Sequence, residues 1–305
     1  MKVLIATDKP FAKIAVDGIR KEIEAVGFEL ALLEKYTEKQ QLLDAVADVD
    51  AIIIRSDIID AEVIGVARNL KIVVRAGAGF DNVDLDTATK AGVCVMNTPG
   101  QNSNAVAELV FGLLIYAVRN FYNGSSGTEL KDKKLGIHAY GNIGRNVARI
   151  AKGFGMEIYA FDAYAPTEFI ENDGVKALNS AEELYELCDV ISLHIPATGE
   201  TKKSINYALL DRMPKGAVLV NTARKEVIDE AELVKLMEAR TDFKYLTDIL
   251  PDNHAEMQEK FPTRYFSTPK KVGAQTAEAN INAGIAAAQQ IVGFILNGDE
   301  KFRVN

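Results

Sequence analysis

The sequence has little cysteine and no excess of positive charge. Only two of its 305 residues are cysteine, Cys94 and Cys188, which predicts buried thiols in a reducing compartment, the cytoplasm, and no disulfide framework. The 35 lysines and arginines are outnumbered by 43 aspartates and glutamates. The resulting net charge of −8 argues against a nucleic-acid or anionic-membrane partner.

Long apolar segments are missing as well. The longest apolar run, Leu109–Val118, is too short to cross a bilayer, so no membrane partner is expected. Asp8 interrupts the apolar start of the chain, so no signal peptide is expected either. No low-complexity segment occurs, and no metal site is predicted. With 48% hydrophobic and 26% charged residues, the composition is that of a globular protein of about two domains.

Short apolar runs alternate with stretches of helical length, such as Phe11–Val26, Ser180–Leu187 and Glu230–Arg240. The runs predict strands at Val3–Ala6, Leu30–Leu33, Ala51–Arg55, Ile72–Arg75, Val93–Met96, Leu135–His138, Glu157–Phe161, Val190–His194, Val218–Asn221 and Tyr245–Thr247. This alternation favours α/β architecture with parallel sheets buried on both faces. So many strands favour two α/β halves over one sheet, although an α/β barrel also alternates in this way.

The boundary between the halves is expected near Asn97-Thr98-Pro99-Gly100, a turn signal that precedes a helical pattern from Asn102 to Tyr122. The most linker-like stretch, Asn123–Gly127, follows that pattern. The last long helix is expected over Ala277–Leu296 and stops at Asn297-Gly298.

A glycine-rich turn opens the second half. The predicted strand that ends at His138 is followed by Ala139, by Tyr140, Gly141, Asn142, Ile143 and Gly144, and then by a helix over Arg145–Phe154. Such a turn lets backbone amides at a helix N-terminus approach a pyrophosphate. Asp162 ends the next strand about 20 residues after Gly141, the spacing of a carboxylate that binds the ribose 2′-hydroxyl and favours NAD over NADP. Ala139 replaces the first glycine of the usual pattern, and a turn that needs small residues only for packing is the alternative.

Several further blocks carry a resemblance to a known family. They are Val74–Asp84, Asn97-Thr98-Pro99, Val106–Leu109, Ser192–Pro196, Asn221-Thr222-Ala223-Arg224, Val227–Glu230 and Gly273-Ala274-Gln275-Thr276. With these blocks the chain resembles the NAD-dependent D-2-hydroxyacid dehydrogenases from about Ile52 onward. It is most similar to the branch that acts on D-3-phosphoglycerate, in the short form without a C-terminal regulatory domain.

The resemblance implies two doubly wound domains with the active site in the cleft between them. A flavodoxin-like substrate domain would comprise residues 1–97 and 281–305, and a Rossmann NAD domain would comprise residues 98–280.

Arg224 is expected just past the carboxyl end of the strand Val218–Asn221, where a guanidinium can bind a carboxylate through two hydrogen bonds. By resemblance it anchors the substrate; a surface ion pair with Glu226 or Glu230 is the alternative.

Where the family has a catalytic histidine this chain has Lys271, and we expect it to act as the acid and base. Lys270 and His254 are the alternatives, although His254 lies in a polar stretch and is expected to be solvated. The glutamate that assists the histidine in the family aligns with Asp252 or Asn253. An ammonium needs no such carboxylate to donate a proton, but to accept one its pKa must be lowered by burial or by Arg224.

The resemblance also assigns cofactor and substrate contacts. Asp248, with the backbone of Gly273 and Ala274, would meet the nicotinamide carboxamide, and His194, Pro196, Thr222 and Ala223 would line the cofactor. Arg55 and Arg75 close neighbouring strands and, with Ser56 and the amides of Ala76, Gly77, Ala78 and Gly79, suit an anion. Asn102 matches a substrate-contacting asparagine, with helix capping as the alternative.

Together with these residues, the resemblance implies NAD-dependent oxidation of 3-phosphoglycerate to 3-phosphohydroxypyruvate, the first step of serine biosynthesis. The alternatives are another 2-hydroxy acid (glyoxylate, hydroxypyruvate or lactate) and an inactive NAD-sensing interaction protein. An apolar helix around Leu109–Val118, taken as exposed, predicts a homodimer. Between Arg119 and Gly127 the chain is about a dozen residues shorter than longer family members, which argues against phosphate contact across that dimer.

Overall fold

The computed structural model describes all 305 residues and divides them into two compact units. Unit 1 comprises Met1–Asn102 and Gln275–Asn305, and unit 2 comprises Ser103–Ala274. These boundaries differ by a few residues from the expected 97/98 and 280/281. The Thr98 N–H donates to the Gly77 carbonyl (2.9 Å), and Arg55 donates to the Asn280 side chain (2.8 Å). These hydrogen bonds hold both boundary segments to unit 1.

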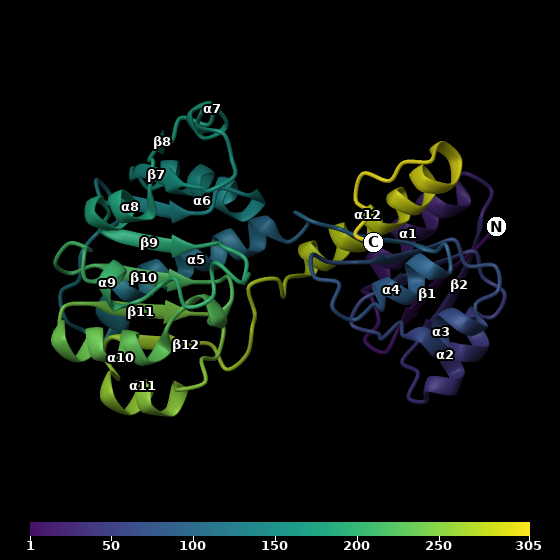
Figure 1. The fold of residues 1–305 in the computed structure, drawn as a ribbon, viewed down its shortest axis with the longest axis horizontal. Coiled ribbons are helices and arrows are strands. Elements are labelled where there is room, and N and C mark those ends of the chain that lie inside the picture. The colour runs from purple at the N-terminus through teal and green to yellow at the C-terminus, as the bar shows by residue number, and fades with distance from the viewer. The chain divides into compact units, whose positions relative to one another are not determined.

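Unit 1 contains a five-stranded, all-parallel sheet in the order β2-β1-β3-β4-β5 (Figure 1). Its strands are β1 (Lys2–Thr7), β2 (Glu29–Glu34), β3 (Ala51–Ile54), β4 (Ile72–Arg75) and β5 (Cys94–Asn97). Its helices are α1 (Lys13–Glu24), α2 (Lys39–Val46), α3 (Ala61–Val66), α4 (Leu85–Lys90) and α12 (Ala277–Asn297). Alternate strand residues face two cores: Val3 and Ile5 pack under α1 and α12, and Leu4 and Ala6 under the other helices.

Unit 2 contains a seven-stranded, all-parallel sheet in the order β12-β11-β10-β9-β6-β7-β8. Its strands are β6 (Lys134–His138), β7 (Glu157–Phe161), β8 (Lys176–Ala177), β9 (Val190–Leu193), β10 (Val218–Asn221), β11 (Lys244–Thr247) and β12 (Tyr265–Ser267). Its helices are α5 (Ser103–Val118), α6 (Asn142–Gly153), α7 (Thr167–Glu171), α8 (Ala181–Leu187), α9 (Tyr207–Leu210), α10 (Glu230–Ala239) and α11 (His254–Lys260), with 3₁₀ turns at Asn120–Tyr122 and Lys225–Val227.

The expected fold class is confirmed. Both sheets are open and doubly wound, which excludes the α/β barrel, and the strand order of unit 1 is flavodoxin-like while that of unit 2 is the Rossmann order with an added edge strand. Each predicted strand is present within a residue or two at its ends. Two short edge strands, β8 and β12, were not predicted.

The expectation of an exposed apolar helix around Leu109–Val118 is wrong. Helix α5 packs against the sheet of unit 2, and its buried residues include Val110, Phe111, Leu114 and Ala117. A helix that is apolar nearly all round belongs in a core, so this segment gives no argument for a dimer.

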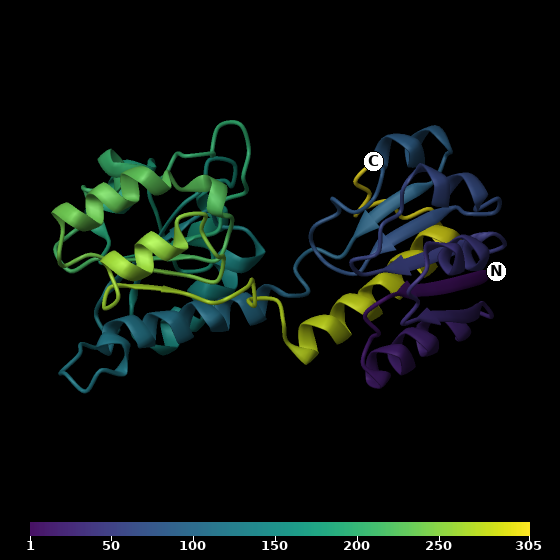
Figure 2. The ribbon, with the colours of Figure 1, turned by 90° about the horizontal axis from the view of Figure 1, so that it is seen from below.

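Helix α12 is long and apolar enough to cross a membrane by length and composition alone. In this structure it packs beside α1 (Figures 1 and 2), and its small residues Ala283, Gly284, Ala287 and Ala288 allow close contact. A Cβ on Gly284 would lie 3.0 Å from the Ile19 side chain, so an alanine there would require that side chain to shift.

The order of each sheet reverses at one point, between β1 and β3 in unit 1 and between β6 and β9 in unit 2. Ligands of open α/β sheets bind at the carboxyl ends of the strands at such reversals. The loops that follow these strands carry Arg55 in unit 1 and the glycine-rich turn and His194 in unit 2.

Candidate active site

The glycine-rich turn joins β6 to α6. The helix N-cap is Gly141, which offers no side chain to cap the first turn of α6, so the amides there remain available to an anion. A Cβ on Gly144 would lie 2.5 Å from the Ala139 carbonyl oxygen, so only glycine fits between helix and turn. Ala139 has φ +78°, a left-handed conformation in which glycine is the favoured residue.

Asp162 holds this turn in place. Its carboxylate accepts the N–H of Tyr140 (2.6 Å) and the N–H groups of Tyr164 (2.8 Å) and Ala165 (2.9 Å). Burial raises the pKa of this carboxyl, but the three N–H donors outweigh that effect and hold the pKa below its usual range. Asp162 therefore stays ionised at the end of β7, where a 2′-phosphate would be repelled.

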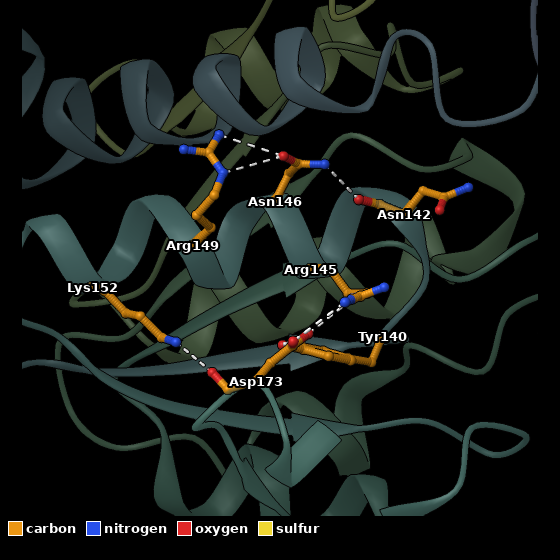
Figure 3. Close-up of polar contacts among 7 residues, drawn as sticks. All are labelled: Tyr140, Asn142, Arg145, Asn146, Arg149, Lys152 and Asp173. Atoms are coloured by element: carbon orange, nitrogen blue, oxygen red, sulfur yellow. Dashed lines mark hydrogen bonds and ion pairs between the residues drawn. The ribbon is translucent and has the colours of Figure 1, made fainter. Parts of the chain in front are cut away.

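Tyr140 is a correction to the predicted pyrophosphate contacts, because its amide is occupied by Asp162. Its hydroxyl donates to Asp173 (3.2 Å), which also pairs with Arg145 (2.8 Å). Figure 3 shows Tyr140, Arg145 and Asp173 beside α6. All three line a cavity of about 450 Å³. The side chain of Tyr140 thus braces the turn. Gly141, Asn142, Ile143 and Gly144 remain the predicted donors to a pyrophosphate.

Three buried polar atoms near the carboxyl ends of the central strands of unit 2 have no hydrogen-bond partner within the protein. They are His194 Nδ1, Thr222 Oγ1 and Asp248 Oδ1. Unpaired buried polar atoms are rare in native proteins and often mark a ligand site. All three belong to the predicted cofactor contacts.

His194 lies directly after β9. Its Nε2 is 3.0 Å from the Ser192 hydroxyl, and burial lowers its pKa to about 3, so the ring is neutral. Pro196, two residues on, is exposed, whereas Thr222 and Ala223 after β10 are buried.

Asp248 lies directly after β11 and is fully buried. Its Oδ2 accepts the Gly273 N–H (2.7 Å), which leaves Oδ1 free. Burial raises the pKa of this carboxyl. A Cβ on Gly273 would lie 2.7 Å from Asp248 Oδ2, so the close approach requires glycine, and Ala274 follows it at the boundary of unit 2.

Arg224 and Lys271 come together at one backbone oxygen. Arg224 Nη1 donates to the Ala223 carbonyl (2.8 Å), and Lys271 Nζ donates to the same oxygen (2.9 Å). The lysine residue as a whole is exposed, but its amine is held by the hydrogen bond to the Ala223 carbonyl. Burial of the amine and the neighbouring Arg224 lower the pKa of Lys271 to about 8, while Asp248 and Glu226 act in the opposite direction.

The ion pair that was the alternative for Arg224 does not form, and neither residue expected to assist Lys271 contacts it. Arg224 forms no ion pair with Glu226 or Glu230. The Glu230 carboxylate instead accepts the N–H groups of Asp252 and Asn253 (both 3.1 Å). The Asp252 carboxylate pairs with Lys225 (2.5 Å). Neither of the two residues expected in place of the family glutamate contacts Lys271.

Lys270 is exposed and makes no side-chain contact with this group. His254 is half-buried, and its Nδ1 is 2.8 Å from the Tyr265 hydroxyl, so it is less open to solvent than expected.

In unit 1, Arg55 and Arg75 lie at the carboxyl ends of β3 and β4, and neither forms a salt bridge. Arg75 Nε donates to the Arg55 carbonyl (3.0 Å), and burial together with Arg55 lowers the pKa of Arg75. Arg55 donates to the carbonyls of Lys9 (2.9 Å) and Pro10 (3.2 Å) and stacks on Phe11. Two adjacent guanidinium groups without a carboxylate partner suit an anion.

The loop after β4 corrects part of the expected anion site. The Ala76 N–H donates to the Ile54 carbonyl (2.8 Å), so it is not available to a ligand. The carbonyls of Gly77 and Ala78 accept from Thr98 N–H and Asn97 Nδ2, and Arg75 covers Gly77 so closely that a side chain would not fit. Ser56, which is exposed, and Gly79 are the other loop residues of the predicted anion site.

Asn102 is half-buried in the turn before α5, and its side chain makes no hydrogen bond within the protein.

Sequence reasoning missed Asn221 and Thr247. The Asn221 side chain accepts the Ala223 N–H (2.9 Å) and donates to the Arg224 carbonyl (3.0 Å), and the Thr247 hydroxyl donates to the Asn221 carbonyl (2.8 Å). The available signal was an asparagine at the end of a buried strand, directly before a turn.

Comparison with known proteins identifies the enzyme family of the chain. Residues 116–270 match the family model "D-isomer specific 2-hydroxyacid dehydrogenase, NAD binding domain". The chain belongs to this family, and the expected cofactor, NAD, is confirmed.

Individual relatives narrow the class of enzyme to which the chain is similar. The chain is 34% identical over 268 residues to D-3-phosphoglycerate dehydrogenase of Methanocaldococcus jannaschii, covering 83% of this chain but 51% of that protein. It is 33% identical to hydroxypyruvate reductase of Thermotoga maritima over 86% of this chain and 90% of that protein. The NAD⁺-bound 3-phosphoglycerate dehydrogenase of Entamoeba histolytica superposes with a TM-score of 0.85 at 46% identity, covering 100% of this chain and 98% of that one. The chain thus spans about half the length of several curated relatives.

Proposed function

We propose that this protein is an NAD-dependent D-3-phosphoglycerate dehydrogenase, which oxidises 3-phosphoglycerate to 3-phosphohydroxypyruvate at the entry to serine biosynthesis. The observation that carries the chemistry is the pairing of Arg224 with Lys271, a fixed cation beside an amine whose pKa is about 8. The 46% identity to a phosphoglycerate dehydrogenase over the whole chain supports the substrate.

The buried Asp248 Oδ1 and the uncapped N-terminus of α6 fit NAD. The α6 amides would hold the pyrophosphate, and Asp248 would accept from the carboxamide. When bound, the nicotinamide supplies the hydride acceptor or donor.

The remaining steps belong to the chain. Arg224 binds the substrate carboxylate and polarises the carbon–oxygen bond next to it. The neutral Lys271 amine accepts the hydroxyl proton during oxidation, and the ammonium returns it during reduction. Arg55, Arg75 and Ser56 bind the substrate phosphate.

The first test is NADH oxidation with 3-phosphohydroxypyruvate beside hydroxypyruvate, pyruvate and glyoxylate, each over a concentration series. We expect kcat/KM for the phosphorylated acid to be at least about a hundredfold higher, or roughly 2.7 kcal/mol of transition-state binding. A preference for an unphosphorylated acid would contradict the substrate and leave the reaction class intact.

A matched pair of variants tests the phosphate site. The double substitution Arg55→Gln and Arg75→Gln is expected to reduce kcat/KM for the phosphorylated acid far more than for hydroxypyruvate. Equal losses for both acids would contradict phosphate binding by these arginines.

Hydroxypyruvate reduction is the second candidate function. It is favoured by the similarity to the Thermotoga maritima reductase over 90% of that protein, and by the hydrogen bonds that already occupy part of the Arg55 guanidinium. If the protein binds NADH but turns over none of the four acids, an NAD-sensing role becomes the better explanation.

We also propose that the protein is a cytoplasmic homodimer with no nucleic-acid or membrane partner. Two free, buried cysteines support a reducing compartment. The dimer rests on the family resemblance, since α5 gives it no support. Light scattering coupled to size-exclusion chromatography measures the mass directly, and a mass of 33.3 kDa would overturn the dimer.

A further inference from the structure

One backbone carbonyl in unit 2 receives both cations of the candidate active site. The Ala223 oxygen accepts from Arg224 Nη1 at 2.8 Å and from Lys271 Nζ at 2.9 Å. A carbonyl has two lone pairs, so it can serve both donors at once. Its position and direction therefore fix where two mutually repelling cations lie.

The direction of this carbonyl is set by Asn221. This side chain, fully buried at the end of β10, forms a bridge across the turn that follows: its Oδ1 accepts the Ala223 N–H (2.9 Å), and its Nδ2 donates to the Arg224 carbonyl (3.0 Å). The bridge fixes the peptide on each side of the Ala223 carbonyl. Thr247 of the neighbouring strand donates to the Asn221 carbonyl (2.8 Å) and anchors the base of the turn.

Asp252 and Asn253, which were expected in place of the family glutamate, do not orient the Lys271 amine. Asp252 pairs with Lys225, and the Asn253 amide is taken by Glu230. The group that orients the Lys271 amine is thus a neutral backbone oxygen.

We propose that Asn221 is a positioning residue for the reaction: it holds the Ala223 carbonyl where Lys271 and Arg224 both donate to it. This inference rests on the proposed function, because it assigns Lys271 to proton transfer and Arg224 to carboxylate binding. A neutral acceptor suits an amine that must alternate between two charge states, because an adjacent carboxylate would stabilise the ammonium.

The charged groups that act on Lys271 are Arg224, Asp248 and Glu226. Burial and Arg224 favour the neutral amine, whereas the two carboxylates favour the ammonium. If the bridge is lost, the amine and the guanidinium separate and both gain water. The pKa of Lys271 then moves up from about 8 toward its ordinary value.

The experiment compares Asn221→Ser and Asn221→Asp with wild type. Serine keeps an oxygen for the Ala223 N–H but has no amide to reach the Arg224 carbonyl, and aspartate keeps the oxygen and adds a negative charge. We expect a ten- to hundredfold fall in kcat/KM for serine. We also expect the Lys271-dependent limb of the pH–rate profile to move up by at least one pH unit, and further for aspartate. The Lys271 pKa is measured independently by NMR titration of ¹³C-methylated lysines, with the signal assigned by Lys271→Met.

Asn206→Ser is the matched control, because Asn206 also accepts a backbone N–H, that of Leu209 at 3.1 Å, and caps α9. Serine caps a helix about as well as asparagine, so this variant is expected to change neither the melting temperature nor the pH profile appreciably. If Asn221→Ser melts cooperatively and its Lys271 titrates as in wild type, Asn221 is only structural and the proposal is overturned. If wild type turns over no 2-keto acid, the proposed function fails, and the NMR titration still decides the role of Asn221.

Discussion

At the residue scale, Lys271 determines how the reaction depends on pH. In oxidation the amine must be neutral to accept a proton, so turnover is expected to rise with pH through about 8. In reduction the ammonium must be present, so turnover is expected to fall above about 8. Initial rates in both directions from pH 6 to 10 measure the two limbs.

The matched variants are Lys271→Met and Lys270→Met. Removing a general acid or base reduces rates by about 10²- to 10⁴-fold. We expect this loss of rate for Lys271→Met but not for Lys270→Met. The limb of the pH–rate profile near pH 8 should also disappear only in Lys271→Met. A normal profile in Lys271→Met would contradict its role and direct attention to His254.

Ala139 is a residue in a conformation that suits glycine better. A non-glycine residue in the left-handed region costs about 1–2 kcal/mol of stability. Glycine removes this cost, but it also raises the entropy of the unfolded chain, which offsets part of the gain. Ala139→Gly is therefore expected to stabilise the protein by about 0.5–1 kcal/mol. Thermal melting measures the change, and it also tests the departure from the glycine pattern.

The comparison substitution is Ala255→Gly, on the exposed surface of α11. Glycine costs up to about 1 kcal/mol relative to alanine in a helix, and less in a first turn such as this one, so the same chemical change should have the opposite sign there. A lower melting temperature for Ala139→Gly would show that the turn is not strained at this position.

At the element scale, the close contact between α6 and the preceding turn is expected to be sensitive to one methyl group. In Gly144→Ala the new Cβ would meet the Ala139 carbonyl at 2.5 Å, and overpacking of this kind costs about 1–3 kcal/mol. The displaced turn should also bind NADH more weakly. Fluorescence titration and thermal melting measure the two effects.

Gly153 supplies the control in the same helix. A Cβ at this last residue of α6 meets nothing within 4 Å, and its φ is not positive. Gly153→Ala is expected to leave NADH affinity unchanged and to stabilise by up to about 1 kcal/mol. If both alanine variants bind NADH as wild type does, the contact at Gly144 does not shape the cofactor site.

Most elements were predictable because parallel strands buried on both faces leave continuous Val/Ile/Leu runs. Strands β8 and β12 were not, because two or three residues give no periodic pattern, and β12 carries mixed residues at an edge. The exposure of α5 was misjudged because a ten-residue apolar run does not say which neighbour covers it. The sheet of unit 2 does so.

The candidate site was predictable where it depends on side chains in motifs, such as Arg224, Lys271 and Asp248. It was not predictable where it depends on backbone atoms. The Ala223 carbonyl has no signature in the sequence, and the occupied amides of Ala76 and Tyr140 follow from strand pairing and from Asp162.

At the scale of the whole molecule, cofactor binding should stabilise unit 2. A ligand at a hundred times its Kd stabilises the folded state by about 2.7 kcal/mol. We expect NADH to slow amide hydrogen exchange in the first turn of α6 and in the segments after β10 and β11. Peptide-resolved exchange with and without NADH measures this directly.

NADPH is the matched ligand for that experiment. Asp162 is ionised and would face the added 2′-phosphate, so we expect NADPH to bind more weakly and to protect the same peptides less. Equal protection by both nucleotides would contradict the assignment of Asp162.

The path of the chain through its two units has a consequence for synthesis on the ribosome. The sheet of unit 1 is complete once Asn97 has been made, but α12, which covers one face of that sheet beside α1, comes only after all of unit 2. Until then Ile5, Ile53 and Val74 on that face lack part of their cover, and an exposed apolar face in a nascent chain invites aggregation. The order of translation therefore makes unit 2 the first part that can finish folding, and makes nascent unit 1 the expected client of a chaperone.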